Sequence, residues 1–245
     1  RARRSRSGKW MILASVLGAP IGMTGYVVAI NNIGPAYTAA ISAFFPAVGA
    51  VLSYFIMHEK LKPYQWAGLL VSLIAVAVLG YTPDSTVPGN WGIGIFAALL
   101  TVFGWGSEAV IMAYCMKEPD VSDEHALLIR QTTSALSYAL VILPLLGGWA
   151  ATIEVAQSSA MPIIAGAAVI GTVSYLFYYK AIVRIGPARS MAINITYSAW
   201  AIPVAFLLLG TIPTPTGIVC AFAIILGSII CATDIKELIG GQKQS

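Results

Sequence analysis

Ile33-Gly34-Pro35-Ala36 recurs as Ile185-Gly186-Pro187-Ala188, and this repeat organises the whole chain. Each copy closes one apolar segment and opens the next, because glycine followed by proline interrupts a helix. A further apolar segment follows each copy, with glycines at Gly68 and Gly217. We therefore expect the chain to contain two copies of one structural unit.

Composition and segment length both indicate a membrane protein. Hydrophobic residues make up 58% of the 245 residues and charged residues 10%, whereas soluble domains carry about 25% charged residues. Each apolar block is long enough to cross a bilayer core, which needs roughly 20 helical residues. The sequence predicts an all-α membrane protein, a polytopic helical bundle in the lipid bilayer, with eight helices at about 10–30, 35–57, 63–81, 91–116, 126–148, 160–183, 187–209 and 215–233.

The positive charges indicate how these helices are oriented. Thirteen of the 14 Lys and Arg residues lie on alternate connections, and the fourteenth, Arg130, lies near the same face. Because Lys and Arg concentrate on the cytoplasmic side of membrane proteins, we expect both ends of this chain to be cytoplasmic. The same rule accounts for the net charge of +4, so no nucleic-acid partner is expected.

The two copies of the repeat have opposite orientations in this arrangement. The first predicted helix runs from inside to outside, whereas the sixth, which opens the second copy, runs from outside to inside. Inverted repeats are a recurrent plan of secondary transporters, with the binding site at the membrane midplane. Two helices precede the second copy, so symmetry leads us to expect two more upstream of Arg1, and thus eight helices present of ten. We assign residues 1–82 to the first half, 89–234 to the second half and 235–245 to a cytoplasmic tail.

Glu108 is the acidic residue that lies well inside a predicted helix, whereas the others lie in connections or in the tail. An ionisable residue at this depth costs about 2.5–3.5 kcal/mol on insertion scales, which makes a functional role the first hypothesis. Trp105 precedes Glu108 by three positions and shares its helix face. A carboxylate beside an indole ring suits an organic cation, because the ring face attracts an ammonium group that has no hydrogen to donate.

Further aromatic and polar residues lie in the helices of both copies. Those that we assign to the substrate site with Glu108 and Trp105 are Tyr26, Tyr175, Asn194, Tyr197 and Trp200. Tyr and Trp also form belts at membrane interfaces, and Tyr178 and Tyr179 can belong to such a belt. A second interpretation of Glu108 is an ion pair with Arg130 on the neighbouring antiparallel helix, and the two roles can alternate during transport.

Enzymatic and metal-binding motifs are absent from the sequence. It has no Gly-x-Ser-x-Gly, no His-Glu-x-x-His and no phosphate-binding loop, so we expect neither an enzyme nor a cofactor. The two histidines lie in cytoplasmic segments, which argues against a metal site in the membrane. The cysteines Cys115, Cys220 and Cys231 lie in apolar stretches without metal-ligand spacing, and we expect buried free thiols. Nothing in the sequence indicates an oligomer.

The repeated turns and their surroundings resemble the drug/metabolite transporter superfamily in its EamA-domain branch. The stretch from Asn32 through Pro46 to Glu59-Lys60-Leu61 and Gly68 is similar to the pattern that ends each half in that branch. The second copy departs from it, with Thr211 near the place of Glu59 and a loop three residues shorter. The resemblance implies a transporter, but members of the superfamily carry many different solutes, so this likeness names no substrate.

A narrower set of motifs resembles the bacterial choline importers of the LicB type. The resemblance implies choline uptake across the bacterial cytoplasmic membrane, coupled to protons, with Glu108 as the available intramembrane carboxylate. The motifs that carry it are Gly18-Ala19-Pro20-Ile21-Gly22-Met23, Trp105-Gly106-Ser107-Glu108, Ala126-Leu127-Leu128-Ile129-Arg130-Gln131 and Ser174-Tyr175-Leu176-Phe177-Tyr178-Tyr179.

The leading hypothesis is a secondary importer of choline or a similar quaternary amine, a small organic cation. Glu108 then compensates the charge, the assigned Trp and Tyr rings contact the ammonium group, and Asn194 adds a polar contact. Two alternatives remain, namely an exporter of amino acids, metabolites or drugs of the same superfamily, and a membrane sensor or scaffold that transports nothing. An exporter does not need a fixed carboxylate among rings, and a scaffold should tolerate Glu108→Gln.

Overall fold

The computed structural model describes residues 6–80, 89–210 and 212–234, and these residues form helices and connections without a β-strand. Eight segments of this part of the chain are long and apolar enough to cross a membrane, so the predicted fold class is confirmed. They are Ser7–Pro35, Tyr37–Ile56, Pro63–Gly80, Trp91–Cys115, Asp123–Leu146, Met161–Ile185, Pro187–Leu208 and Pro215–Ala232.

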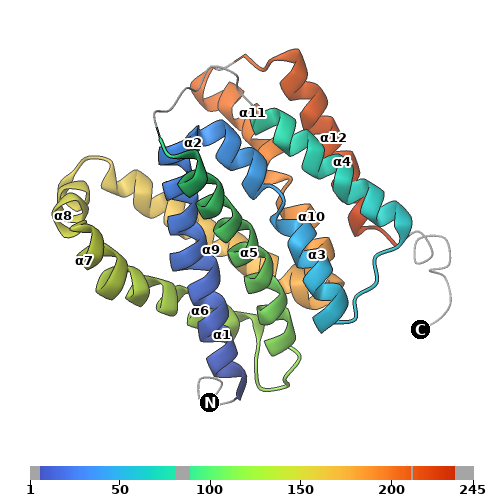
Figure 1. Ribbon diagram of the computed structural model, residues 1–245, viewed down its shortest axis with the longest axis horizontal. Helices are drawn as coiled ribbons and strands as arrows, with labels where there is room; N and C mark the ends of the chain where they lie inside the picture. Colours follow the sequence, from blue (N-terminus) through green and yellow to red (C-terminus); the bar gives the residue numbers. More distant parts are fainter. Residues whose placement is uncertain (1–5, 81–88, 211, 235–245) are drawn as a thin grey trace.

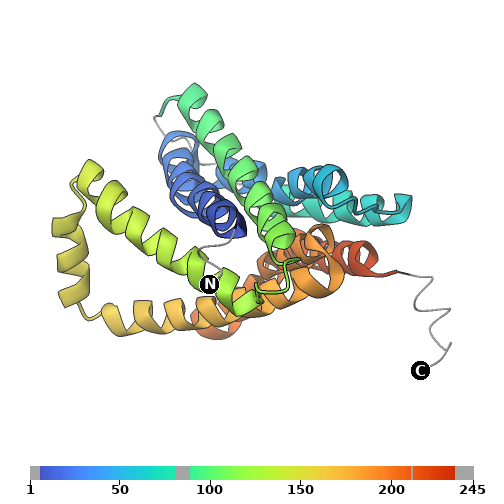
Figure 2. The ribbon, with the colours of Figure 1, turned by 90° about the horizontal axis from the view of Figure 1, so that it is seen from below.

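The two copies of the repeat lie on opposite sides of the molecule (Figures 1 and 2). Figure 2 shows α1 to α5 in one layer and α9 to α12 in the other, with α6 to α8 joining the layers at one end. The helices in chain order are α1 (Arg6–Val16), the π-helix η2 (Leu17–Met23), α2 (Thr24–Ser42), α3 (Phe45–Ile56), α4 (Pro63–Gly80), α5 (Trp91–Cys115), α6 (Asp123–Ser137), the π-helix η3 (Tyr138–Ile142), α7 (Leu143–Leu146), α8 (Trp149–Gln157), α9 (Met161–Ile185), α10 (Pro187–Asn194), α11 (Tyr197–Leu209) and α12 (Pro215–Ala232).

The repeated turn has the same backbone conformation in both copies. Gly34 has φ/ψ of 80°/163° and Gly186 has 87°/158°. Glycine is needed here, because other residues rarely combine a positive φ with an extended ψ. Four residues later, the hydroxyls of Thr38 and Ser190 donate to the carbonyls of these glycines, each at 2.8 Å. The repeat that is visible in the sequence is therefore a repeat of structure.

Each copy then breaks its next span at an equivalent place. The chain turns at residues 43–44 before α3 and at residues 195–196 before α11, and these turns are 152 positions apart, like Pro35 and Pro187. The sequence predicted continuous helices over 35–57 and 187–209, so the breaks are a correction. In the first copy the physical reason is Pro46, which lies in the first turn of α3, where its missing backbone N–H leaves no helical hydrogen bond unmade. The second copy breaks without such a proline.

The last helices of the two copies, α4 and α12, pack against each other in antiparallel orientation. The Ser72 hydroxyl of α4 donates to the Ile224 carbonyl of α12 at 3.0 Å. Farther towards the start of α4, Gln65 Nε2 donates to the carbonyl of Cys231 at 3.0 Å, near the end of α12. Equivalent helices that run in opposite directions mean that the two copies are inverted, as predicted.

The correspondence between Gly68 and Gly217 is wrong. Helices α4 and α12 both have 18 residues and begin at Pro63 and Pro215, again 152 positions apart. The loop of the second copy is therefore not three residues shorter, because the equivalent positions are the helix starts and not the two glycines. Thr211, the position equivalent to Glu59, lies outside the described residues.

The first span differs from its counterpart α9 in containing the π-helix η2. This segment surrounds Pro20, whose missing N–H and ring prevent a regular α-helical ladder. The carbonyl of the preceding Ala19 accepts a hydrogen bond from the Tyr138 hydroxyl at 3.3 Å. The same span runs on through Asn31 and Asn32, which the sequence placed in a loop; they belong to α2, and the chain breaks only at Gly34.

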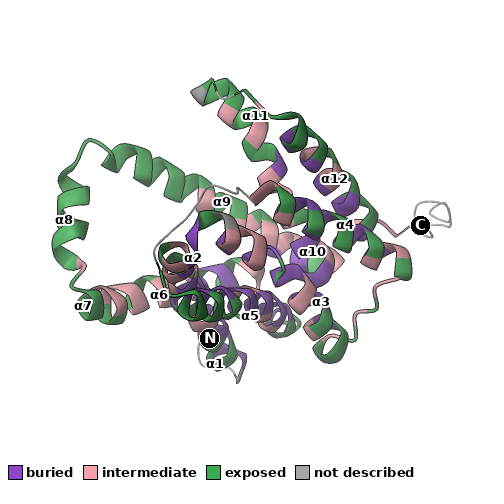
Figure 3. Ribbon diagram, turned by 45° about the horizontal axis from the view of Figure 1, so that its top comes forward, coloured by how far each residue is buried: buried purple, intermediate pink, exposed green. Residues whose placement is uncertain are grey.

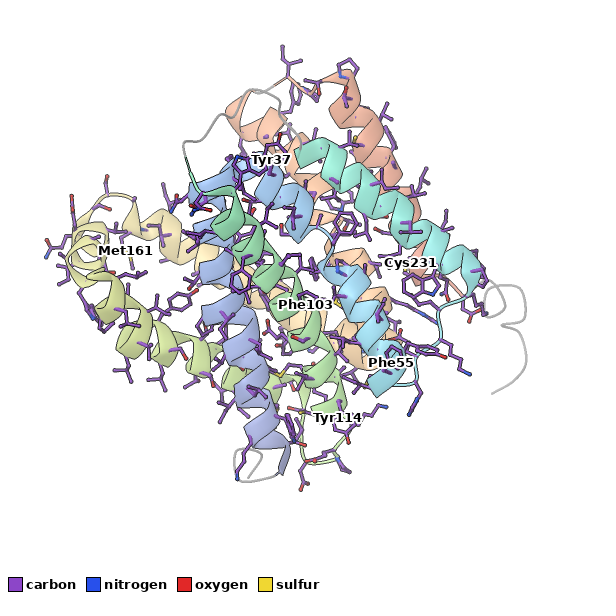
Figure 4. All side chains as sticks on the ribbon, in the orientation of Figure 1. Tyr37, Phe55, Phe103, Tyr114, Met161 and Cys231 are labelled. Atoms are coloured by element: carbon purple, nitrogen blue, oxygen red, sulfur yellow. The ribbon has the colours of Figure 1, made fainter. Side chains whose placement is uncertain are left out.

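Apolar side chains cover much of the outside of the molecule. Figure 3 shows α8 and most of α9 exposed, whereas α5 and α10 carry many buried residues. Phe55, Phe103 and Tyr114, which Figure 4 labels, are each more than half exposed, whereas Cys231 is fully buried. Such an exterior suits contact with lipid, because soluble proteins rarely expose large apolar patches.

The three cysteines are buried free thiols, as predicted. Helix α8 is a further correction, since the sequence predicted only a connection there.

Candidate substrate site

Helix α5 presents Glu108 and Trp105 to the interior of the bundle. Asn90 caps the helix by accepting a hydrogen bond from the backbone N–H of Ile93 at 3.1 Å, which satisfies a donor at the first turn. Glu108 is buried. The Trp105 ring stacks on Tyr26, with centroids 5.5 Å apart, and meets the edge of Phe45 at 5.8 Å. The face that the sequence assigned to Glu108 and Trp105 therefore points inward.

Glu108 forms an ion pair with Arg130 of α6. Arg130 Nε donates to Glu108 Oε1 at 2.7 Å, and both residues are buried. This is the contact that the sequence raised as a second interpretation of Glu108. A charge that is buried far from water needs a partner, and the guanidinium supplies one. The carboxylate is thus compensated within the protein before any substrate enters.

Two tyrosines of α9 complete the surroundings of this ion pair. The Tyr175 hydroxyl accepts a hydrogen bond from Arg130 Nη2 at 3.2 Å, and the guanidinium carbon lies 4.1 Å from the centre of the Tyr175 ring. The Tyr179 hydroxyl donates to Glu108 Oε1 at 3.5 Å. Only 1% of Tyr179 is exposed, which rules out for Tyr179 the interfacial belt that the sequence left open. It lies one helical turn beyond Tyr175, on the face of α9 that looks towards α5.

A cavity of about 310 Å³ opens beside the ion pair. Its volume is at the lower end of the range for ligand pockets, which suits a small solute. Aromatic rings and one carboxylate dominate its walls. The lining residues are Met23, Phe45, Trp105, Glu108, Ala109, Ser174, Tyr175, Tyr178, Tyr179, Asn194 and Tyr197.

The cavity lies where the two inverted copies meet. Phe45 and Tyr197 are 152 positions apart and are the first residues of the helices that follow the two breaks. Met23 and Tyr175, which also line the cavity, are related by the same interval. Broken helices are tolerated inside a membrane where they line a cavity. The sequence expectation of a site between the halves therefore agrees with the position of this cavity.

The structure brings most of the residues that we assigned to the site together. Five of them line the cavity directly, namely Trp105, Glu108, Tyr175, Asn194 and Tyr197. Tyr26 lies behind Trp105 and contacts its ring. Trp200 does not line this cavity. It lines a neighbouring one of about 550 Å³, which shares Ser174, Tyr178, Asn194 and Tyr197 with the first. Trp200 itself is 60% exposed.

Sequence reasoning missed several residues of the cavity wall. These residues are Met23, Phe45, Ala109, Ser174, Tyr178 and Tyr179. The interval of 152 residues could have indicated three of them, because Met23, Phe45 and Tyr178 are the counterparts of the assigned Tyr175, Tyr197 and Tyr26. No local sequence signal distinguishes Ala109 or Ser174 from ordinary helix-packing residues.

A second group of charges ties the copies together away from the cavity. Glu59, in the connection between α3 and α4, accepts a hydrogen bond from the Ala188 backbone N–H at 3.3 Å, in the first turn of α10. Asp234, at the end of α12, pairs with Lys62 and lies 3.9 Å from Arg189 Nη2. Burial raises the pKa of the Glu59 carboxyl, and this effect outweighs the Ala188 N–H and Arg189, which lower it.

Two comparisons with known proteins agree with the resemblance predicted from the motifs. A sequence model of the EamA-like transporter family matches residues 1–81 and 92–233. Protein LicB of Haemophilus influenzae (strain ATCC 51907 / DSM 11121 / KW20 / Rd) is 33% identical over 196 residues. That match covers 80% of this chain and spans 65% of the length of the relative.

Proposed function

This chain belongs to the EamA-like transporter family, and we propose that it imports choline or a similar quaternary amine across the cytoplasmic membrane. The observation that carries the proposal is a carboxylate, Glu108, in the wall of a cavity whose other walls are mainly aromatic. A quaternary ammonium has no N–H to donate. It therefore gains most from a fixed negative charge and from ring faces, and both are present here.

The lining residues divide between two tasks in this proposal. Glu108 offers the counter-charge, while Trp105, Tyr175 and Tyr197 offer rings to the methyl groups around the nitrogen. Asn194 can hydrogen-bond a hydroxyl group such as the one that choline carries. Trp200 lines the adjoining cavity, so we assign it to the path of the substrate and not to the binding position.

The membrane orientation is part of the same proposal. The distribution of Lys and Arg supports a cytoplasmic position for both ends of this chain, by the positive-inside rule. The turns at Gly34 and Gly186 then lie on opposite membrane surfaces, with the cavity between them. Movement of one copy relative to the other would expose the site alternately to the two sides, as inverted repeats permit.

We also propose that uptake is coupled to protons, with Glu108 as the carboxylate involved. A proton and a quaternary ammonium compete for the same carboxylate. One carboxylate therefore fits exchange of one cation for the other, and the direction of the pH gradient that accelerates uptake becomes part of the test.

The test is uptake of labelled choline by the protein reconstituted in liposomes, with a pH gradient of either sign and with none. We expect saturable uptake that other quaternary amines inhibit, and its loss in Glu108→Gln. The matched control is Glu154→Gln, which makes the same change on the exposed helix α8. If no quaternary amine is taken up or competes, the proposed substrate class is wrong. Normal transport by Glu108→Gln would instead reject the site assignment.

The two alternative functions, exporter and non-transporting sensor or scaffold, predict different results in the liposome assay. An exporter of amino acids or drugs would release those solutes from loaded vesicles and leave choline outside. A sensor or scaffold would move neither class of solute, and its stability would tolerate Glu108→Gln.

A further inference from the structure

Arg130 makes the contacts that the proposed substrate cation would make. Its guanidinium lies against the Glu108 carboxylate, with Nε 2.7 Å from Oε1, and over the Tyr175 ring, 4.1 Å from the ring centre. Glu108 and Tyr175 are both in the wall of the cavity, whereas Arg130 is not. A carboxylate and a ring face are also what a quaternary ammonium needs. One charge partner therefore faces two cations, one belonging to the protein and one to the substrate.

We propose that Arg130 is a tethered cation that occupies Glu108 when the site is empty, and that the substrate binds by displacing it. This inference rests on the proposed function, because it assumes a cationic substrate at Glu108. It adds a competitor to that site, and it makes the strength of the Arg130 contact a determinant of substrate affinity.

The different hydrogen-bonding capacities of the two cations give the physical reason. Arg130 and Glu108 together are neutral, and an arginine side chain keeps its proton in proteins. A cation that entered beside an intact ion pair would find its carboxylate already compensated, and would add an unpaired charge to a buried site. Displacement leaves the net charge of the site unchanged, but it moves the uncompensated charge from the quaternary ammonium, which cannot donate a hydrogen bond, to the guanidinium, which keeps two neutral acceptors.

The structure provides acceptors that Arg130 can keep after it leaves Glu108. Its Nη1 donates to Gln131 Oε1 at 3.1 Å, and its Nη2 donates to the Tyr175 hydroxyl at 3.2 Å. Gln131 is held in turn, since its Nε2 donates to Thr172 Oγ1 of α9 at 3.3 Å. Release from Glu108 thus breaks the contact between α5 and α6 while the contacts of Arg130 with α6 and α9 persist. Substrate binding would loosen α5 from α6 in this way.

The direction in which choline affinity changes in Arg130→Ala distinguishes a displaced competitor from a structural ion pair. Arg130→Ala is prepared in the whole chain, and choline binding is titrated first without and then with methylguanidinium at low concentration. If Arg130 is a competitor, Arg130→Ala tightens choline binding by about 10-fold, because Glu108 no longer has to be released from the guanidinium before choline binds. Added methylguanidinium then occupies the vacated place and weakens choline binding. Urea at the same concentration is the uncharged control, and wild type should respond to neither compound.

The opposite sign would overturn the inference. If Arg130 serves only to hold the site together, Arg130→Ala weakens choline binding and methylguanidinium restores it. A second variant covers the case in which Arg130→Ala does not fold. Arg130→Met removes the charge but keeps most of the side-chain volume, so displacement predicts tighter choline binding in this variant as well. Weaker or unchanged choline binding in Arg130→Met would count against displacement.

Failure of this inference is distinguishable from failure of the proposed function. If wild type does not bind choline, or if Glu108→Gln binds it equally well, the proposed function fails and displacement has no basis. If choline binds through Glu108 but methylguanidinium strengthens binding in Arg130→Ala, only the displacement is wrong.

Discussion

Gly18 of η2 packs directly against the carboxylate of Glu108. A methyl group built at Gly18 would collide with Oε2 and with the carboxyl carbon, and would stand 2.8 Å from Cβ. The π-helical segment around Pro20 brings this glycine to the carboxylate. At Gly22, one turn later, a Cβ atom would stand 2.9 Å from Cδ1 of the Trp105 ring. The irregular segment of the first span therefore sets the positions of two residues on another helix.

Gly18→Ala should impair transport while leaving the fold intact. The new methyl group must push the Glu108 side chain out of its place, and a displacement of about 1 Å at a binding group can cost about 100-fold in rate. We expect choline uptake in liposomes to fall about 10-fold or more. Gly166→Ala is the matched control, because a methyl group there meets no atom within 4 Å. Normal uptake by Gly18→Ala would show that the position of Glu108 does not limit transport.

Gly186→Ala should destabilise the protein. The backbone at this position, with φ of 87° and ψ of 158°, belongs to a region that is essentially restricted to glycine and costs other residues about 1–3 kcal/mol. A Cβ atom would also stand 2.5 Å from Glu59 Oε1. Thermal unfolding in detergent should show a lower midpoint than wild type, whereas the control Gly171→Ala should unfold like wild type. Equal midpoints for the two variants would contradict the strained turn.

Part of the destabilisation by Gly186→Ala should remain when the Glu59 side chain is removed. In the Glu59→Ala background the steric contact is absent but the backbone cost persists. Gly186→Ala should therefore still lower the unfolding midpoint there, by less than it does in wild type.

Glu59 should make stability depend on pH. Burial raises the pKa of its carboxyl in the folded protein, so the folded state binds this proton more tightly than the unfolded state does. The resulting stabilisation is complete below the unfolded pKa and is lost as pH rises through the folded pKa. Thermal midpoints measured against pH should fall over this window in wild type and fall less in Glu59→Gln. Parallel curves for the two proteins would mean that Glu59 does not contribute to the pH dependence of stability.

Gly68→Leu should separate α4 from α12. A Cβ atom at Gly68 would stand 2.6 Å from the Gly227 carbonyl, a backbone atom that cannot rotate away. Overpacking of this kind typically costs about 1–3 kcal/mol, so the unfolding midpoint should fall. The control is Ala67→Leu, which adds a similar side chain on the exposed side of the same helix. If both variants unfold alike, the antiparallel contact of the two helices is not required for stability.

Much of the fold could be predicted from the order of the residues. Hydropathy, glycine-proline turns and the spacing of the repeated tetrapeptide predicted eight spans and two inverted copies, because a bilayer demands long apolar helices whatever their neighbours are. The same reasoning selected Glu108 and Trp105, since an isolated carboxylate in an apolar span is conspicuous. It failed where equivalent helices had to be aligned without a shared motif, as with Gly68 and Gly217.

The contacts between helices could not be predicted in this way. Periodicity places Tyr175 and Tyr179 on one face of α9, yet it does not say whether that face meets lipid, another helix or a cavity. Rotation and tilt follow from side-chain packing against neighbours that are distant in the sequence, such as Gly18 against Glu108. The chain alone thus established the spans, their inversion and the conspicuous carboxylate. Packing established that Arg130 already compensates this carboxylate and that rings from both copies enclose the space beside it.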